Sequence, residues 1–245
     1  PREFRELQAN GITDILLVAN KSKQAIEDYF DSAPELEHLL RAKGDTAQLA
    51  DIAASTAVNL HFIRQQAADG IGSALALAED FIDGEDFCFV LSDDVLPLPT
   101  TLLQQLWQAH TASGQQMLAT VPIAAKQSEQ YGIVEWADKA AGQIKRIAEK
   151  PTPATAPSQD AVFGRYVFSA AIFDQLAQYP ADQQQFAQAL NALAAEGNLT
   201  GLPYGGPREN IDGRLSLLEA NIDLALTDPD TAAPLRAYLR RLVSD

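Results

Sequence analysis

Residues 65–72 read QQAADGIG, and residues 89–95 read FVLSDDV. The first stretch predicts a glycine-containing loop that enters an apolar helix, and the second predicts a short strand that ends on Asp93 and Asp94. In an open α/β sheet, ligands bind at the carboxyl ends of the strands. A carboxylate at that edge, close to a loop whose backbone can approach a nucleotide, indicates a magnesium-assisted reaction on phosphate.

Strands and helices alternate around these two stretches. The pattern predicts strands at residues 12–19, 59–64, 87–91 and 116–122. It predicts helices at residues 23–30, 34–53, 71–82 and 100–113. This βαβ rhythm is typical of an α/β, Rossmann-like fold, in which a mixed, mainly parallel sheet is flanked by helices.

The rhythm changes after Pro122, where strands follow one another through short turns. Strands are predicted at residues 132–136, 143–148, 161–168 and 199–204. Helices are predicted at residues 170–178, 183–196, 215–226 and 233–243. We therefore expect a single domain over residues 1–245, with a nucleotide-binding half at 1–122 and a sugar-phosphate-binding half at 123–245.

Composition narrows the possible functions. The chain has 245 residues, 47% of them hydrophobic, which allows a large core. Its formal charge of −15 opposes binding to a nucleic-acid backbone. We find neither an apolar run of about 20 residues nor the apolar stretch of a signal peptide, so we expect a cytoplasmic protein without a membrane role. Cys88, in FCFVL, reads as a buried hydrophobe, and the scattered histidines do not form a zinc site.

Several segments share an ordered pattern. Residues 61–75 resemble an R-Q-x-x-P-x-G-L-G-H-A loop, and residues 89–95 resemble L-G-D-D. Residues 128–136 (SEQYGIVEW) resemble S-x-Y-G-I, residues 144–158 resemble a V-E-K-P stretch, and residues 163–176 resemble a G-R-Y strand with its helix. Together with residues 11–31, these segments resemble the bacterial UTP–glucose-1-phosphate uridylyltransferases of the sugar-phosphate nucleotidyltransferase superfamily.

The resemblance implies a reaction in which a glucose 1-phosphate oxygen attacks the α-phosphorus of UTP, giving UDP-glucose and pyrophosphate with Mg²⁺. It implies that Gln65 hydrogen-bonds the uracil and that Gly70 and Gly72 let the backbone approach base and ribose. Asp93 is the expected Mg²⁺ ligand and catalytic carboxylate, with Asp94 beside it at the nucleotide.

The same resemblance assigns the sugar side. Gly132 and Glu149 are expected to hold glucose hydroxyls, and Lys150 to neutralise the sugar phosphate as a catalytic cation. Tyr166 is expected to line the sugar pocket. We expect UTP and glucose 1-phosphate as the small-molecule partners, and a homo-oligomer as the assembly.

Two departures from the family pattern leave alternatives open. The turn at 210–216 (NIDGRLS) resembles D-x-G-D-K-L-G but has Asn210 at the expected metal carboxylate, so either Asp212 is the second metal ligand, which we expect, or the second metal contact is lost. The family's opening G-x-G-T-R loop would lie before Pro1, and we expect an upstream segment or another chain to supply it. The alternatives are a catalytically inactive or regulatory homologue that binds nucleotide-sugar, and a nucleotide-sugar-dependent glycosyltransferase.

Overall fold

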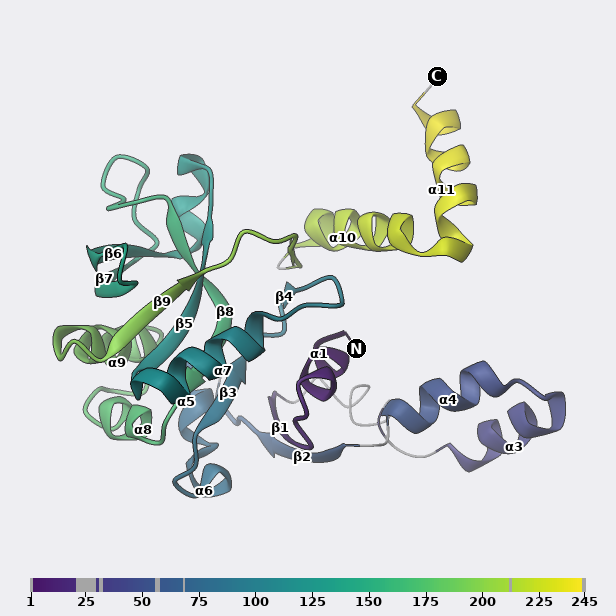
Figure 1. Cartoon of the computed structure of the whole chain (residues 1–245), viewed down its shortest axis with the longest axis horizontal. Helices are drawn as coiled ribbons and strands as arrows, with labels where there is room; N and C mark the ends of the chain where they lie inside the picture. The colour runs from purple at the N-terminus through teal and green to yellow at the C-terminus, as the bar shows by residue number, and fades with distance from the viewer. Residues whose placement is uncertain are drawn as a thin grey trace.

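The computed structural model describes residues 2–20, 30, 33–55, 58–67, 69–211 and 213–243 (Figure 1). Its helices are α1 (Arg2–Ala9), α3 (Pro34–Lys43), α4 (Thr46–Ser55), α5 (Ile71–Ala76), α6 (Glu79–Ile82), α7 (Leu102–Ser113), the 3₁₀ helix η1 (Ala125–Gln130), α8 (Ala171–Leu176), α9 (Gln185–Ala195), α10 (Arg214–Thr227) and α11 (Pro229–Leu242). Its strands are β1 (Asp14–Ala19), β2 (Asn59–Arg64), β3 (Phe87–Val90), β4 (Asp94–Val95), β5 (Gln116–Pro122), β6 (Gly132–Asp138), β7 (Gln143–Glu149), β8 (Asp160–Phe168), β9 (Leu199–Pro203) and β10 (Glu209–Asn210).

The central sheet has six strands in the order β3-β8-β5-β9-β7-β6, with one further pairing between β8 and β6. Strands from before and after residue 122 therefore share one sheet, in which β8 lies between β3 and β5. Two small sheets complete the described part of the chain: a parallel pair of β1 with β2, and an antiparallel pair of β4 with β10. Figure 1 shows α3 and α4 to one side of the six-stranded sheet, and α10 and α11 extending away from it.

The α/β fold class is confirmed, whereas the balance of strand directions differs from the expectation. Within the six-stranded sheet, only β5 and β9 pair in parallel among the described residues, and the other ladders are antiparallel. Strands β6 and β7 are antiparallel because four residues, 139–142, join them, and a parallel crossover needs a dozen or more. Strand β8 then returns between β3 and β5, antiparallel to both.

The two faces of the central sheet carry separate halves of the core. Residues Val162, Tyr166 and Phe168 of β8 pack on one face, under α5, α8 and α9. Ala161, Phe163 and Val167 pack on the other face, with α1 and α7. This follows from the alternation of side chains along a strand. Among the described helices, none is both long enough and apolar enough to cross a membrane.

Two predicted helices are each divided in the structure. The helix expected at 34–53 ends at Lys43 because Gly44 takes φ 70°, a left-handed conformation that terminates helices, and α4 then begins at Thr46. The helix expected at 71–82 divides after Ala76, where Ala78 N–H donates to Leu75 O at 2.9 Å and tightens the turn. Most of the helix expected at 23–30 lies outside the described residues.

Candidate functional site

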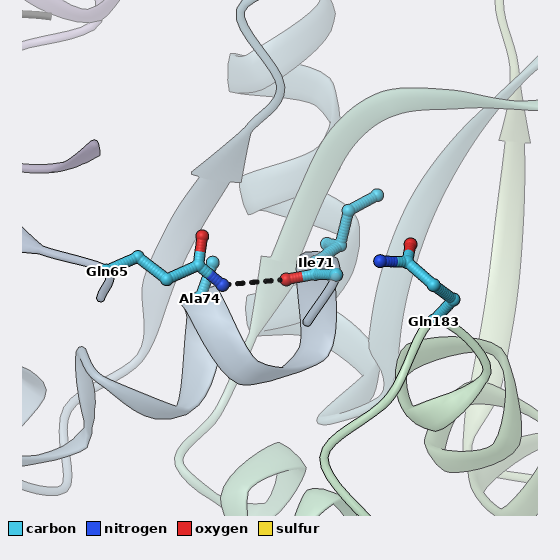
Figure 2. A pocket seen from close by; sticks show the side chains of 5 residues that line it. Gln65, Ile71, Ala74 and Gln183 are labelled. Atoms are coloured by element: carbon cyan, nitrogen blue, oxygen red, sulfur yellow. Dashed lines mark hydrogen bonds between the residues drawn. The ribbon is translucent and has the colours of Figure 1, made fainter. Parts of the chain in front are cut away.

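The loop between β2 and α5 is held by a side-chain amide. Gln65 Nε2 donates to Gly70 O at 3.2 Å and to Ser73 Oγ at 3.1 Å, and Ser73 Oγ donates to Gly70 O at 3.1 Å. Figure 2 shows the Gln65 amide facing the start of α5 in a pocket that is also lined by Ile71, Ala74 and Gln183. The predicted uracil-binding residue thus lies in a hollow next to the glycine loop, and its role there stays a prediction.

The two glycines of this loop are explained by close packing against the start of helix α9 and the residues just before it. Gly70 has φ 107°, and a Cβ atom there would lie 3.1 Å from Gln183 Cα. Gly72 is buried, and a Cβ atom there would lie 2.8 Å from Gln185 Oε1 and 3.0 Å from Phe186 N. Close packing therefore requires glycine at both positions. A direct approach of these residues to a nucleotide stays a prediction.

The two predicted carboxylates after β3 have different surroundings. Asp94 is 5% exposed, and its Oδ2 accepts a hydrogen bond from Gly164 N–H at 3.0 Å. Asp93 is exposed, and its carbonyl oxygen accepts from Ile211 N–H at 2.8 Å. Because Asp94 faces into the sheet, Asp93 is the carboxylate of the pair that is presented to solvent, and its contact with a ligand stays a prediction.

An unpredicted buried ion pair lies beneath this turn. The guanidinium of Arg165 is 0% exposed and bonds the carboxylate of Glu6, which is 2% exposed, at 2.8 Å. Arg165 also donates to Leu91 O at 3.2 Å, to Gly164 O at 2.9 Å and to Asp94 O at 2.8 Å. An arginine inside the apolar strand DAVFGRYVF signals a buried partner. That partner lies 159 residues away, and the sequence does not identify it.

The sugar-side residues lie at the junction of β6 and β7. Gly132 is paired with Glu149 in the ladder, and a Cβ atom on Gly132 would lie 3.3 Å from Glu149 Oε2. Lys150 N–H donates to Tyr131 O at 3.0 Å. The side chains of Glu149 and Lys150 are exposed, and Lys150 has φ 45°, which few residues other than glycine adopt. The three predicted residues are therefore neighbours.

Tyr166 is 3% exposed and packs among Phe89, Phe168 and Phe186. Burial raises the pKa of its hydroxyl, and the charges of Asp94, Asp93 and Glu149 raise it further. The ring therefore lies in the buried layer on the face of the sheet that α5, α8 and α9 cover. Its expected place in the lining of a sugar pocket stays a prediction.

Strand β8 brings the two groups of predicted residues together. Val162 Cγ2 lies 3.7 Å from the position of a Cβ atom on Gly132, while Asp94 Oδ2 lies 2.8 Å from that of a Cβ atom on Gly164. Residues two apart on a strand share a face and are roughly 6.5–7 Å apart. The carboxylate turn and the Gly132–Glu149 pair therefore meet over one face of β8.

The donors at this face fit a magnesium ion that is shared with substrate phosphates. Mg²⁺ in such sites is bound by one or two carboxylates, and phosphate and water oxygens complete its shell. Asp93 supplies one exposed carboxylate. Within the described residues, no group of three His, Cys, Asp or Glu side chains is arranged to hold a metal by itself. The second predicted ligand, Asp212, lies outside the described residues, and Asn210 is seen pairing its backbone with Asp94.

Comparisons with known proteins show to which family the chain is similar. Residues 3–202 match the family model described as Nucleotidyl transferase. The UTP–glucose-1-phosphate uridylyltransferase of Staphylococcus epidermidis is 30% identical over 243 residues, covering 97% of this chain and 84% of that protein. The UTP–glucose-1-phosphate uridylyltransferase YngB of Bacillus subtilis is 32% identical over 249 residues, covering 97% of this chain and 82% of that protein.

Solved structures of UDP-glucose pyrophosphorylases are also similar to this chain. A UDP-glucose pyrophosphorylase from Acinetobacter baumannii is similar with a TM-score of 0.88 and 27% identity, covering 98% of this chain and 87% of that chain. A UTP-bound UGPase from the same organism is similar with a TM-score of 0.87 and 27% identity, covering 97% of this chain and 86% of that chain.

Proposed function

Since the chain belongs to the nucleotidyl transferase family, we propose that it transfers a uridylyl group from UTP to glucose 1-phosphate, forming UDP-glucose and pyrophosphate. One observation carries the proposal beyond family membership. The carboxylate turn and the Gly132–Glu149–Lys150 group meet over one face of β8, so a nucleotide and a sugar phosphate bound to them would be neighbours. The names of the relatives support the choice of substrates.

The chemistry fits residues that bind and orient anions. A sugar phosphate is already a competent nucleophile, so the site needs charge neutralisation and alignment more than a base. Lys150 neutralises the sugar phosphate, while Gly132 leaves room for the sugar beside the Glu149 carboxylate, which accepts bonds from its hydroxyls. Gln65 reads the uracil from its pocket, and Gly70 and Gly72 bring the loop backbone close to the nucleotide.

The proposed cofactor is Mg²⁺, which Asp93 would hold, with Asp212 as the second candidate ligand. When bound, the ion would neutralise charge on the phosphates of UTP. Tyr166 supports the floor of the site from the sheet, and Asp94 fixes the turn through Gly164. Only Asp93 of the two adjacent carboxylates is assigned to the metal, because Asp94 is turned inward.

The proposal is tested by UDP-glucose and pyrophosphate formation from UTP and glucose 1-phosphate with Mg²⁺. Asp93→Asn should lower turnover tenfold or more, equivalent to at least about 1.4 kcal/mol. Asp94→Asn should keep turnover within a few-fold, since an amide oxygen can still accept from Gly164 N–H. Asp174→Asn, an exposed substitution on α8, is the control for loss of one negative charge.

The outcomes separate the rival functions. A protein that binds UDP-glucose but releases no pyrophosphate would be a regulatory homologue. Transfer of glucose from UDP-glucose to an acceptor would identify a glycosyltransferase. A tenfold loss of turnover in Asp94→Asn alone would show that Asp94, and not Asp93, is the metal ligand.

We also propose a homo-oligomer that works in the cytoplasm. Exposed apolar side chains on the C-terminal helices support an assembly surface: Leu215 is 66% exposed, Leu218 57% and Leu242 55%. A single cysteine fits a reducing compartment.

A further inference from the structure

We propose that Arg165, paired with Glu6, is a positioning residue that fixes the turn at residues 91–94 and thereby presents Asp93 to the metal and nucleotide. The inference deepens the proposed function, on which it rests for the role of Asp93. The position of Arg165 relative to the turn is given by hydrogen bonds within this chain.

The hydrogen bonds of Arg165 hold both ends of the turn. Its Nη1 donates to Leu91 O at 3.2 Å, and its Nη2 donates to Asp94 O at 2.8 Å. These two carbonyls stand on either side of Ser92 and Asp93. A planar guanidinium with donors in a fixed fork can hold two acceptors at a set separation, which a single ammonium cannot do.

Glu6 fixes the guanidinium from the other side. Its Oε1 accepts from Arg165 Nε at 3.1 Å, and its Oε2 accepts from Nη2 at 2.8 Å. Helix α1 thus orients the fork, although it lies far from the turn in sequence. With Nη1 also donating to Gly164 O at 2.9 Å, every nitrogen of the guanidinium is engaged.

Stability alone is a poor explanation for this arrangement. Removing two charges from water is expensive, and replacing a buried ion pair with apolar side chains of similar volume is often neutral or stabilising. What apolar side chains would not supply is the pair of hydrogen bonds to the turn.

Two further contacts restrain the same turn from other directions. Gly164 N–H fixes the Asp94 carboxylate at 3.0 Å, and Ile211 N–H fixes the Asp93 carbonyl at 2.8 Å. The backbone on both sides of Asp93 is therefore held by β8, β10 and α1 together, while the Asp93 side chain is exposed. Such support is what a metal ligand needs, because small displacements of a ligand weaken a site.

The test separates positioning from folding with three variants. Glu6→Met/Arg165→Met removes both charges and both turn contacts, and we expect its urea unfolding midpoint to fall less than that of Glu6→Gln, because no unpaired charge stays buried. Arg165→Lys keeps the charge opposite Glu6 but loses the fork. Glu6→Gln keeps the Arg165 donors to Leu91 O and Asp94 O. It leaves the guanidinium charge buried without its carboxylate, so the urea unfolding midpoint should fall.

Binding of Mn²⁺ in the presence of UTP, followed by electron paramagnetic resonance, is the main readout. We expect the double variant to bind Mn²⁺ at least tenfold more weakly, Arg165→Lys at least threefold more weakly, and Glu6→Gln within twofold of the wild type. UTP affinity without metal should be unchanged in all three, and kcat for UDP-glucose formation should fall with Mn²⁺ affinity. Glu135→Met/Arg146→Met removes an ion pair at the surface and is the matched control.

Wild-type Mn²⁺ affinity in either folded Arg165 variant would overturn the inference. So would losses of Mn²⁺ affinity that simply follow the unfolding midpoint, with Glu6→Gln the most affected. A wild-type protein that binds no Mn²⁺ with UTP would also overturn it. Normal Mn²⁺ binding without UDP-glucose formation would contradict the proposed function and leave the role of Arg165 supported.

Discussion

Lys150 combines a charged side chain with a backbone conformation that favours glycine. Its φ of 45° is held by the bond from its N–H to Tyr131 O, and its side chain is exposed beside Glu149. A non-glycine residue in this left-handed region costs roughly 1–2 kcal/mol, which surrounding structure must offset. A strained residue at a candidate site is an indication that its side chain is needed there.

Two substitutions at Lys150 should therefore separate stability from binding. Lys150→Gly should raise the free energy of unfolding by up to about 1 kcal/mol, because relief of strain exceeds the entropy cost of glycine. That corresponds to about 2–4 °C in Tm. Lys150→Ala keeps the strained backbone and should give no such gain. Both should weaken glucose 1-phosphate binding about tenfold or more in calorimetry, through loss of the ammonium. A lower Tm for the glycine variant would contradict the strain argument.

Single residues also mark how far the sequence could predict the site. Gly132 and Glu149 are neighbours and Asp93 is exposed, which their motifs favour because they fix local spacing, while the roles of these residues stay predictions. The burial of Asp94 and the link from Arg165 to Glu6 could not be foreseen. Both depend on contacts between segments 70 or more residues apart, which a linear pattern does not encode.

Among the elements, strand bounds were easier to predict than strand directions. Strands β2 and β5 begin and end where the pattern predicts, because each is a compact apolar run with clear ends. The direction of β8 depends on its pairing with β3 and β5, which are distant in sequence, and no local sequence signal specifies that direction. Gly44 is a local signal for the end of α3, but helix-forming residues lie on both sides of it, so the pattern predicts one continuous helix.

Strand β3 supplies a prediction about pH. Burial, and secondarily the negative charge of Glu6, raise the pKa of the Cys88 thiol from 9.0 to about 12. In the unfolded chain the thiol ionises from about pH 9, whereas in the fold it stays protonated. Its contribution to stability is therefore fully present below pH 9 and is lost as the pH rises toward 12, by about 1.4 kcal/mol per pH unit.

Urea unfolding of wild type and Cys88→Ala at pH 8 and pH 10 measures this contribution, because the other titrating groups cancel in the difference. The stability advantage of the wild type should shrink by about 1 kcal/mol between the two conditions. A difference that stays constant with pH would show that the thiol ionises freely in the fold.

At the scale of the whole molecule, one sheet supports both candidate subsites. Residues from before and after Pro122 reach the same face of β8, so binding of one substrate and binding of the other are expected to share a rigid support. The apolar side chains of α10 and α11 lie elsewhere, on helices that extend away from this sheet (Figure 1). Exposed patches of this kind are typical of interfaces between proteins.

Leu215 and Leu218, 66% and 57% exposed, are three apart on α10 and so share one helical face. If this face joins copies of the chain, Leu215→Glu/Leu218→Glu should convert the assembly toward a 26.5 kDa monomer in light scattering after size exclusion, because charge at a buried apolar interface is costly. Leu36→Glu/Leu39→Glu on α3, 48% and 55% exposed, is the matched control. A wild-type monomer would contradict the proposed assembly, and an assembly indifferent to the α10 substitutions but broken by those on α3 would place the interface on α3.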